Sequence, residues 1–314
     1  MPPRVAVTRR LVEPVRAELE RRFELRIHDS EEPPARAELL RLAEGAAGLV
    51  TMLTDAVDAE LLEAAGPGLR VVANHATGHD NVDLEAARAR GVVVTTTPGV
   101  LERATAEHTL ALVLALVRRV AAGDRFLRRG EPWAWAPTFM LGRGLAGRML
   151  GVVGLGRIGS EVARLGEVLG LEVVYAARTP RDVPYDRLPL GKLLARAEVV
   201  SLHVPLTEET RGLIGAAELG LMRRDAVLVN TARGPVVDEA ALVEALGAGE
   251  IAGAALDVFE DEPAVYPGLL ELENVVLTPH LGSATEEARE AMGRLCVEAL
   301  TAVLLEDRVP ETAV

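Results

Sequence analysis

The chain has 314 residues with 49% apolar side chains, enough for two domains with buried cores, and no apolar run approaches the roughly 18–20 residues of a membrane-spanning helix. Its formal net charge of −13 disfavours nucleic acid as a partner, because the phosphate backbone selects basic surfaces, but it permits a small anionic substrate. The single cysteine excludes an intramolecular disulfide, and the N-terminal residues lead straight into a strand-like run rather than a signal peptide, so we expect a cytoplasmic protein without membrane partners.

The N-terminal third of the chain alternates short apolar runs with segments of helical spacing. This alternation is typical of a parallel β-sheet covered by helices. Asp55 is expected to cap the helix predicted over residues 58–64. Strands are predicted at residues 4–8, 23–28, 48–51, 69–73 and 92–95, and helices at residues 11–22, 35–43, 58–64 and 84–90.

One long helix is predicted over residues 101–129, after the break at Pro98-Gly99. It is mostly apolar between residues 110 and 120, which predicts burial between domains or subunits. An irregular segment, residues 133–145, comes next and carries both tryptophans.

A second series of strands and helices fills the rest of the chain, and its last helix is expected to return to the first domain. We predict an α/β protein with two Rossmann-like or flavodoxin-like parallel-sheet domains. Residues 1–98 with 286–314 would form a discontinuous substrate-binding domain, and residues 99–285 a dinucleotide-binding domain. The interdomain cleft is the default ligand site. Strands are predicted at residues 149–153, 172–175, 199–204, 226–230, 253–257 and 274–278, and helices at residues 160–169, 191–196, 218–222, 239–248 and 286–305.

A glycine motif, Gly154-Leu155-Gly156-Arg157-Ile158-Gly159, stands between an apolar strand and a helix. In dinucleotide sites the first glycine permits a tight turn, the second lets the pyrophosphate approach, and the third lets helix pack on strand. The helix N-terminus then offers N–H groups to the phosphates. The motif alone is weak, but its setting favours a cofactor site made by these six residues over a structural turn.

Three further motifs follow strands in the last third of the chain: Asn230-Thr231-Ala232-Arg233-Gly234, residues 256–263, and Thr278-Pro279-His280-Leu281-Gly282. With the glycine motif and residues 50–55 and 74–83, they resemble the D-isomer-specific 2-hydroxyacid dehydrogenase family, in particular its glyoxylate/hydroxypyruvate reductase branch. The resemblance covers nearly the whole chain. It implies reduction of a small 2-oxo acid by a nicotinamide cofactor in a homodimeric enzyme.

The chemistry of such a reduction suits three residues of these motifs. Arg233 can hold a carboxylate with a fork of N–H donors and polarise the carbonyl. His280 can donate the proton, since the reference pKa of histidine suits reversible transfer. Glu262 can bind the other ring nitrogen and orient His280. Each residue also has a non-catalytic alternative. Arg233 would be a surface charge, Glu262 a solvated loop acid and His280 a structural histidine.

The resemblance implies further roles. Leu53 would border the substrate, and the backbone of the Thr77-Gly78 turn would hold its carboxylate, unless that turn is a mere connection. Trp135 matches a tryptophan that reaches into the partner's site in similar dimers; alternatively, both tryptophans fill the interface. No cluster has metal-ligand spacing, so no metal is predicted. Residues expected on the cofactor side are His203, Pro205, Thr231, Ala232, Asp257 and Gly282, of which Asp257 could instead be a helix cap.

The end of the second Rossmann strand indicates the cofactor. An acidic residue usually binds the ribose 2′-hydroxyl of NAD about 20 residues past the glycines. Here Ala177 holds that place and Arg178-Thr179 follow, so we predict that NADP(H) is preferred, with NAD(H) still used. The alternative is that Arg178 stacks on adenine and both cofactors serve.

Two other functions stay open. Phosphoglycerate dehydrogenase shares the fold and the Arg-Glu-His triad. That family usually carries an acidic residue at the position that Ala177 occupies in this chain. A corepressor-like protein that senses dinucleotides without catalysis also shares the fold and triad, but such a protein carries a disordered tail, which we do not expect here.

Overall fold

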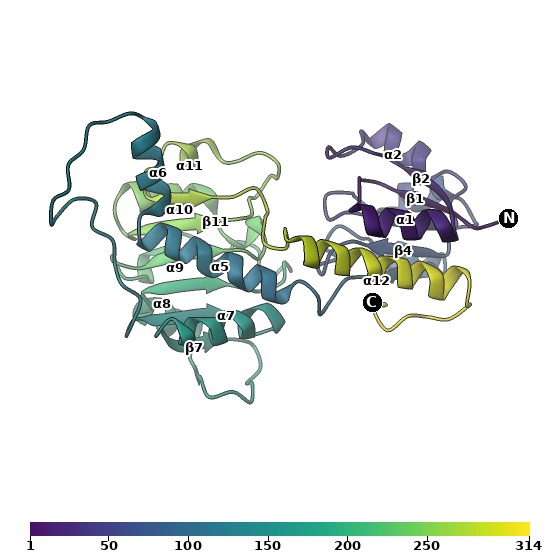
Figure 1. The fold of residues 1–314 in the computed structure, drawn as a ribbon. Coiled ribbons are helices and arrows are strands. Elements are labelled where there is room, and N and C mark those ends of the chain that lie inside the picture. The colour runs from purple at the N-terminus through teal and green to yellow at the C-terminus, as the bar shows by residue number, and fades with distance from the viewer. The chain divides into compact units, whose positions relative to one another are not determined.

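The computed structural model describes residues 1–314, which divide into two compact units. Unit 1 comprises Met1–Leu101 and Ala284–Val314, and unit 2 comprises Glu102–Ser283 (Figure 1). None of the helices combines the length and apolar character needed to cross a lipid bilayer.

Unit 1 is built on a five-stranded parallel sheet. In sheet order its strands are β2 (Glu24–Ile27), β1 (Arg4–Val7), β3 (Gly48–Thr51), β4 (Val71–Asn74) and β5 (Val93–Thr95). Its helices are α1 (Glu13–Arg22), α2 (Arg36–Ala43), α3 (Ala59–Ala65), α4 (Leu84–Ala89) and α12 (Glu286–Leu304).

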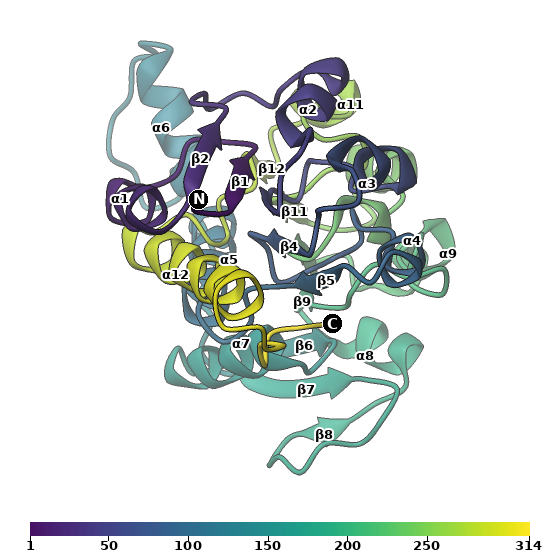
Figure 2. The ribbon, with the colours of Figure 1, turned by 90° about the vertical axis from the view of Figure 1, so that its right-hand side faces the viewer.

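Both faces of this sheet are buried. The helices α1 and α12 cover one face, and α2, α3 and α4 cover the other (Figure 2). Successive strand residues point to opposite faces, so Val5 and Val7 pack towards α12 whereas Ala6 packs towards α2 and α3. This double burial explains why the inner strands β1, β3 and β4 are mainly apolar in the sequence.

Unit 2 contains a seven-stranded sheet whose pairings are all parallel. In sheet order its strands are β12 (Val275–Leu277), β11 (Gly253–Leu256), β10 (Val227–Asn230), β9 (Val199–Leu202), β6 (Met149–Val153), β7 (Glu172–Ala176) and β8 (Asp186–Arg187). Its helices are α5 (Glu102–Val117), α6 (Val120–Arg128), α7 (Arg157–Val168), α8 (Leu190–Arg196), α9 (Ala216–Leu221), α10 (Glu239–Gly247) and α11 (Pro267–Leu270), with a 3₁₀ turn at Gly234–Val236.

The strand order of unit 2 creates a ligand-binding edge. The helices α5 and α7 cover one face, and α8, α9 and α10 cover the other. From β6 the chain runs outward through β7 and β8, then returns to β9 on the opposite side of β6. Open α/β sheets bind ligands at the carboxyl ends of the strands where the order reverses in this way. The structure thus confirms an α/β protein with two parallel sheets.

The prediction of one long helix over residues 101–129 is wrong. α5 ends at Val117 and α6 begins at Val120, because Arg119 adopts a left-handed φ of 57°. The carbonyl of Val117 accepts a hydrogen bond from the N–H of Arg143 at 2.8 Å. A backbone contact from the irregular segment therefore replaces a helical hydrogen bond, and helical periodicity could not reveal it.

One local expectation also needs correction. Asp58, not Asp55, caps α3, since its carboxylate accepts the N–H of Leu61 at 3.0 Å. Asp55 is buried and instead accepts hydrogen bonds from the N–H of Met52 and the hydroxyl of Thr8.

Candidate active site

The turn between β6 and α7 needs its glycines for different reasons. Gly154 has a left-handed φ of 93°, and a Cβ there would lie 2.6 Å from the carbonyl oxygen of His203. A Cβ at Gly159 would lie 2.1 Å from the carbonyl oxygen of Gly154, so α7 packs directly on the turn. Gly156 meets nothing within 4 Å, and no side chain caps the helix that it begins. Open space and uncapped N–H groups at the start of α7 fit a phosphate group.

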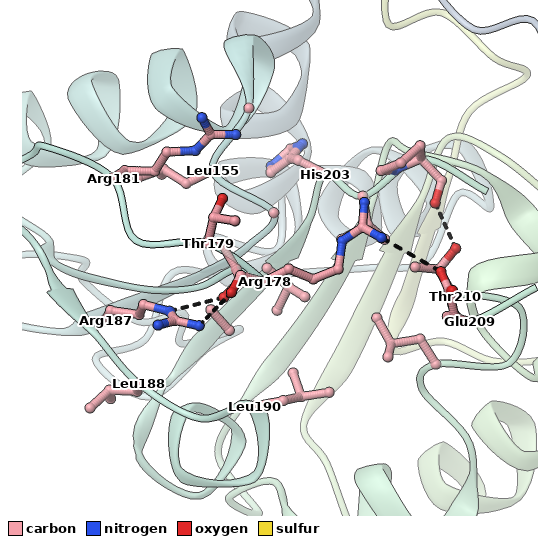
Figure 3. Close-up of a pocket in the computed structure, with 18 of the residues that line it drawn as sticks. Leu155, Arg178, Thr179, Arg181, Arg187, Leu188, Leu190, His203, Glu209 and Thr210 are labelled. Atoms are coloured by element: carbon pink, nitrogen blue, oxygen red, sulfur yellow. Dashed lines mark hydrogen bonds and ion pairs between the residues drawn. The ribbon is translucent and has the colours of Figure 1, made fainter. Parts of the chain in front are cut away.

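A cavity of about 1090 Å³ opens at the carboxyl ends of β6, β7 and β9 (Figure 3). Apolar side chains, among them Leu188, Leu190 and Leu213, line part of it. An apolar slot with a few polar groups is typical of a small-molecule site, and beside the glycine turn it suits an adenine nucleotide. Seven of the residues expected to bind the cofactor line this cavity: Gly154, Leu155, Gly156, Arg178, Thr179, His203 and Pro205.

The wall after β7 is held in place by hydrogen bonds to its backbone. Arg187 donates to the carbonyl oxygens of Ala177 at 2.9 Å and Arg178 at 2.7 Å. The hydroxyl of Tyr175 accepts the N–H of Arg181 at 2.9 Å. The guanidinium of Arg187 therefore binds backbone carbonyl groups of this wall. The side chain of Arg178, in contrast, is 83% exposed.

His203 lines this pocket but does not suit acid–base chemistry. Its Nε2 lies 2.8 Å from the hydroxyl oxygen of Ser201, and its Nδ1 is buried without a partner. Burial of the ring lowers the pKa of His203 to about 3. The ring is therefore neutral near pH 7, as expected for a residue that lines the site.

Arg233 lies in a tight turn just past β10. The side chain of Asn230 fixes this turn, since its amide donates to the carbonyl of Arg233 at 2.8 Å and its oxygen accepts the N–H of Ala232 at 3.0 Å. Gly234 is essential to the packing, because a Cβ there would lie 1.9 Å from the carbonyl carbon of Phe259. Thr231 is buried and its hydroxyl lies 2.9 Å from that of Thr109 on α5.

His280 and Glu262 form a direct pair. The Nδ1 of His280 lies 2.8 Å from one carboxylate oxygen of Glu262, and the other oxygen accepts the N–H of Phe259 at 3.0 Å. Both side chains are about one-quarter exposed, at 25% and 23%. With Nδ1–H donated to the carboxylate, Nε2 is the nitrogen that can serve a substrate.

Asp257, directly after β11, organises the loop that carries His280. Its backbone carbonyl accepts the N–H of His280 at 2.8 Å, and its carboxylate accepts those of Leu281 and Gly282, each at 2.8 Å. His280 has a left-handed φ of 54°, a conformation that needs such support in a residue with a Cβ. No helix starts at Asp257, so it is not a helix cap.

Two partners of Asp257 are not evident from the sequence. The hydroxyl of Thr278 donates to its carboxylate at 2.6 Å, and Nε2 of His108 on α5 lies 3.1 Å away. Desolvation raises the pKa of Asp257, but these partners and the loop N–H groups outweigh it and hold the pKa below its usual range. Asp257 and His108 are 149 residues apart, so no local pattern could have joined them.

The turns expected to bind substrate lie at the carboxyl edge of the sheet in unit 1. Leu53 follows β3, and Thr77-Gly78 follow β4. Asn81 links the two turns, because its amide donates to the carbonyls of Met52 at 3.0 Å and Asp55 at 2.9 Å. The amide of Asn74 donates to the carbonyl of Gly78 at 3.0 Å and to the side-chain oxygen of Asn81 at 3.1 Å. One polar network therefore fixes both turns.

Trp135 lies outside all of these clusters. It belongs to the irregular segment after α6 and is 79% exposed. Trp133 stacks on Phe139, with 6.3 Å between the ring centroids. No group of three or more His, Cys, Asp or Glu side chains is arranged to hold a metal ion.

The edge of unit 2 thus combines a nucleotide-sized pocket with groups suited to carbonyl chemistry. Arg233, Glu262 and His280 follow β10, β11 and β12, which are parallel neighbours, so all three lie at one edge of the sheet. A hydrogen bond joins Glu262 to His280, and the turn that carries Arg233 packs against the same segment through Gly234 and Phe259. This is the arrangement of a dehydrogenase of the dinucleotide-binding class.

The chain belongs to the D-isomer specific 2-hydroxyacid dehydrogenase family, because residues 110–282 match the model of that family's NAD binding domain. Over 311 residues it is 47% identical to a glyoxylate reductase of Korarchaeum cryptofilum, covering 96% of this chain and 93% of the relative. A glyoxylate reductase of Pyrococcus furiosus is 46% identical over 312 residues, covering 96% and 92%.

Solved structures are similar along the whole chain. A Thermus thermophilus protein superimposes with a TM-score of 0.94 and 48% identity, covering 99% of each chain. An NADPH-dependent glyoxylate/hydroxypyruvate reductase from Sinorhizobium meliloti, in complex with NADP and malonate, gives a TM-score of 0.86 and 34% identity, covering 100% of this chain and 97% of that one. The family resemblance seen in the sequence is therefore confirmed.

Proposed function

We propose that this protein is a glyoxylate and hydroxypyruvate reductase that prefers NADPH. The observation that carries the proposal is the pairing of His280 with Glu262 at the same sheet edge as Arg233. Relatives named glyoxylate reductase at about 45% identity along nearly the whole chain support the substrate class.

The residues of unit 2 divide the chemistry between them. A bound reduced nicotinamide supplies the hydride. Arg233 binds the substrate carboxylate with its N–H fork and polarises the carbonyl group. His280 donates a proton from Nε2 to the carbonyl oxygen as the alkoxide develops. Glu262 holds the ring through Nδ1–H and balances the positive charge of the protonated imidazole.

Residues of unit 1 are proposed to complete substrate binding. The backbone N–H groups of Thr77 and Gly78 would hold the carboxylate, and Leu53 would contact the rest of the substrate. The hydrogen bonds of Asn74 and Asn81 support this role, because they keep both turns in a fixed conformation without using those N–H groups.

The proposed cofactor preference rests on the pocket wall after β7. Arg178, Arg181 and Arg187 all line the pocket, and Ala177 stands where NAD-selective folds carry an acid. A 2′-phosphate would gain a charge-assisted hydrogen bond from Arg178, and Thr179 can add a hydroxyl donor. The proposal is supported by the related Sinorhizobium meliloti reductase, whose structure is a complex with NADP.

Arg178→Ala should lower kcat/KM for NADPH by about 10–100-fold and leave kcat/KM for NADH nearly unchanged, since only the phosphate contact is lost. Steady-state kinetics with both cofactors at saturating glyoxylate measure this. Wild-type preference for NADH, or an unchanged preference in the variant, would refute the proposed specificity.

We also propose that the chain forms a homodimer through α6 and the segment after it. The helix α6 buries none of its residues, and Figure 1 shows it projecting with the following segment from the rest of unit 2. Exposed apolar patches mark interaction surfaces, and tryptophan is enriched in them. In a dimer Trp135 would reach the partner's site or fill the interface. The most exposed large apolar residues here are Val120, Leu127, Trp133, Trp135 and Leu141.

A substrate panel tests the proposed function. Purified enzyme at micromolar concentration should oxidise NADPH with glyoxylate and hydroxypyruvate at a few turnovers per second or more, within the common range for enzymes. Faster turnover of 3-phosphohydroxypyruvate than of glyoxylate would favour a phosphoglycerate dehydrogenase. No turnover, with NADPH still bound, would favour a dinucleotide-sensing binding protein.

A further inference from the structure

The nucleotide pocket of unit 2 contains one carboxylate opposite its arginines. Among the residues that line it, Arg178, Arg181 and Arg187 are basic, and Glu209 alone is acidic. The Nη1 of Arg178 lies 3.6 Å from a carboxylate oxygen of Glu209, and Figure 3 shows Arg178 extending towards it. The residue expected to bind a 2′-phosphate is thus already paired with an anion.

The turn that carries Glu209 is fixed by local hydrogen bonds. The hydroxyl of Thr210 accepts the N–H of Thr207 at 2.8 Å and donates to the carbonyl of Pro205 at 2.6 Å. The hydroxyl of Thr207 donates to the carboxylate of Glu209 at 3.2 Å. The backbone of Arg178 is held by Arg187 on the other wall. The backbones on both walls are therefore held in place, with the nearest atoms of the guanidinium and the carboxylate 3.6 Å apart.

We propose that Glu209 is a specificity-determining residue that weakens binding of the 2′-phosphate and so moderates the preference for NADPH over NADH. This inference rests on the cofactor specificity proposed above. Both side chains are largely exposed, at 83% and 76%, so the pair adds little to stability. Its effect is on binding: a dianionic phosphate at Arg178 must displace the carboxylate or lie close to it, whereas a ribose hydroxyl carries no charge.

The variant Glu209→Gln tests this. It keeps the length of the side chain and an oxygen that can accept from Thr207, and it removes only the charge. Glu208→Gln is a matched control, because Glu208 is exposed on the same turn but does not line the pocket. Calorimetric titration of the full-length protein with 2′,5′-ADP and with 5′-AMP separates the 2′-phosphate from the rest of the nucleotide.

We expect Glu209→Gln to tighten binding of 2′,5′-ADP by about 3–10-fold at low salt, as one charge within several ångströms of the phosphate predicts. Binding of 5′-AMP should stay within about twofold, and the gain should shrink towards 0.5 M salt as the charges are screened. The control should bind both probes like the wild type.

Other results would overturn the inference. An unchanged ratio of the two affinities in Glu209→Gln would show that the carboxylate has no influence on the phosphate. Weaker binding of 5′-AMP would show that Glu209 serves as a ribose acceptor instead. If the wild type binds 5′-AMP more tightly than 2′,5′-ADP, the proposed NADPH preference fails, but the shift in ratio still tests the role of Glu209.

Discussion

Replacing His280 with alanine should lower kcat for glyoxylate reduction by about 10²–10⁴-fold, the usual contribution of a positioned general acid. KM for glyoxylate and for NADPH should change little, because the binding of the substrate carboxylate and of the nucleotide is assigned to other residues. The proton would then have to come from water instead of a positioned side chain. Steady-state kinetics at pH 7 measure both parameters.

Glu262→Gln is the companion variant for this prediction. Glutamine keeps the size of the side chain and one acceptor oxygen, which can still accept Nδ1–H of His280, but its NH₂ group cannot accept the N–H of Phe259. The variant therefore removes the charge and one supporting hydrogen bond. We expect kcat to fall in this variant, but by less than in His280→Ala. A neutral amide balances the charge of the protonated imidazole less well than a carboxylate does. Near-normal turnover in His280→Ala would contradict the assignment of His280 as the proton donor.

Arg233→Ala should lower kcat and raise KM for glyoxylate together, for a combined loss of about 10²–10³-fold or more in kcat/KM. The guanidinium is assigned both to the substrate carboxylate and to the carbonyl whose charge develops in the transition state, so both parameters report on it. KM for NADPH should remain near the wild-type value, because the nucleotide pocket does not include Arg233.

Arg233→Lys distinguishes charge from shape at this position. Lysine keeps the positive charge but cannot bind a carboxylate through two parallel N–H groups. We expect it to recover only a small part of the lost kcat/KM. Full recovery would mean that Arg233 acts only as a point charge, and an unchanged kcat in Arg233→Ala would mean that it does not contact the reacting group.

The sequence predicted those parts of the site that depend on local pattern. The residues Arg233, Glu262 and His280 each follow a short apolar run, and each such run is a strand of one parallel sheet. Gly154 and Gly159 were expected to permit a turn and a close helix, and a Cβ at either would collide with backbone oxygens. Strand ends and glycine turns are set by neighbours in the sequence, so they are readable there.

Other features depend on contacts between distant segments. His108 meets Asp257 across 149 residues, and Arg119 breaks the helix because residues 142 and 143 pack against its end. Glu209 is an ordinary exposed acid in the sequence and gains significance only from its position opposite Arg178. Asp55, expected at a helix end, is drawn into a buried network with Thr8 and Arg9.

The most direct test is a crystal structure of the protein with NADP and oxamate, an unreactive analogue of a 2-oxo acid. The carboxylate of oxamate should lie within hydrogen-bond distance, about 2.7–3.2 Å, of the guanidinium of Arg233, with its amide oxygen at the same range from Nε2 of His280. A complex in which oxamate binds away from Arg233, or in which Nε2 of His280 faces away from it, would contradict the proposed mechanism.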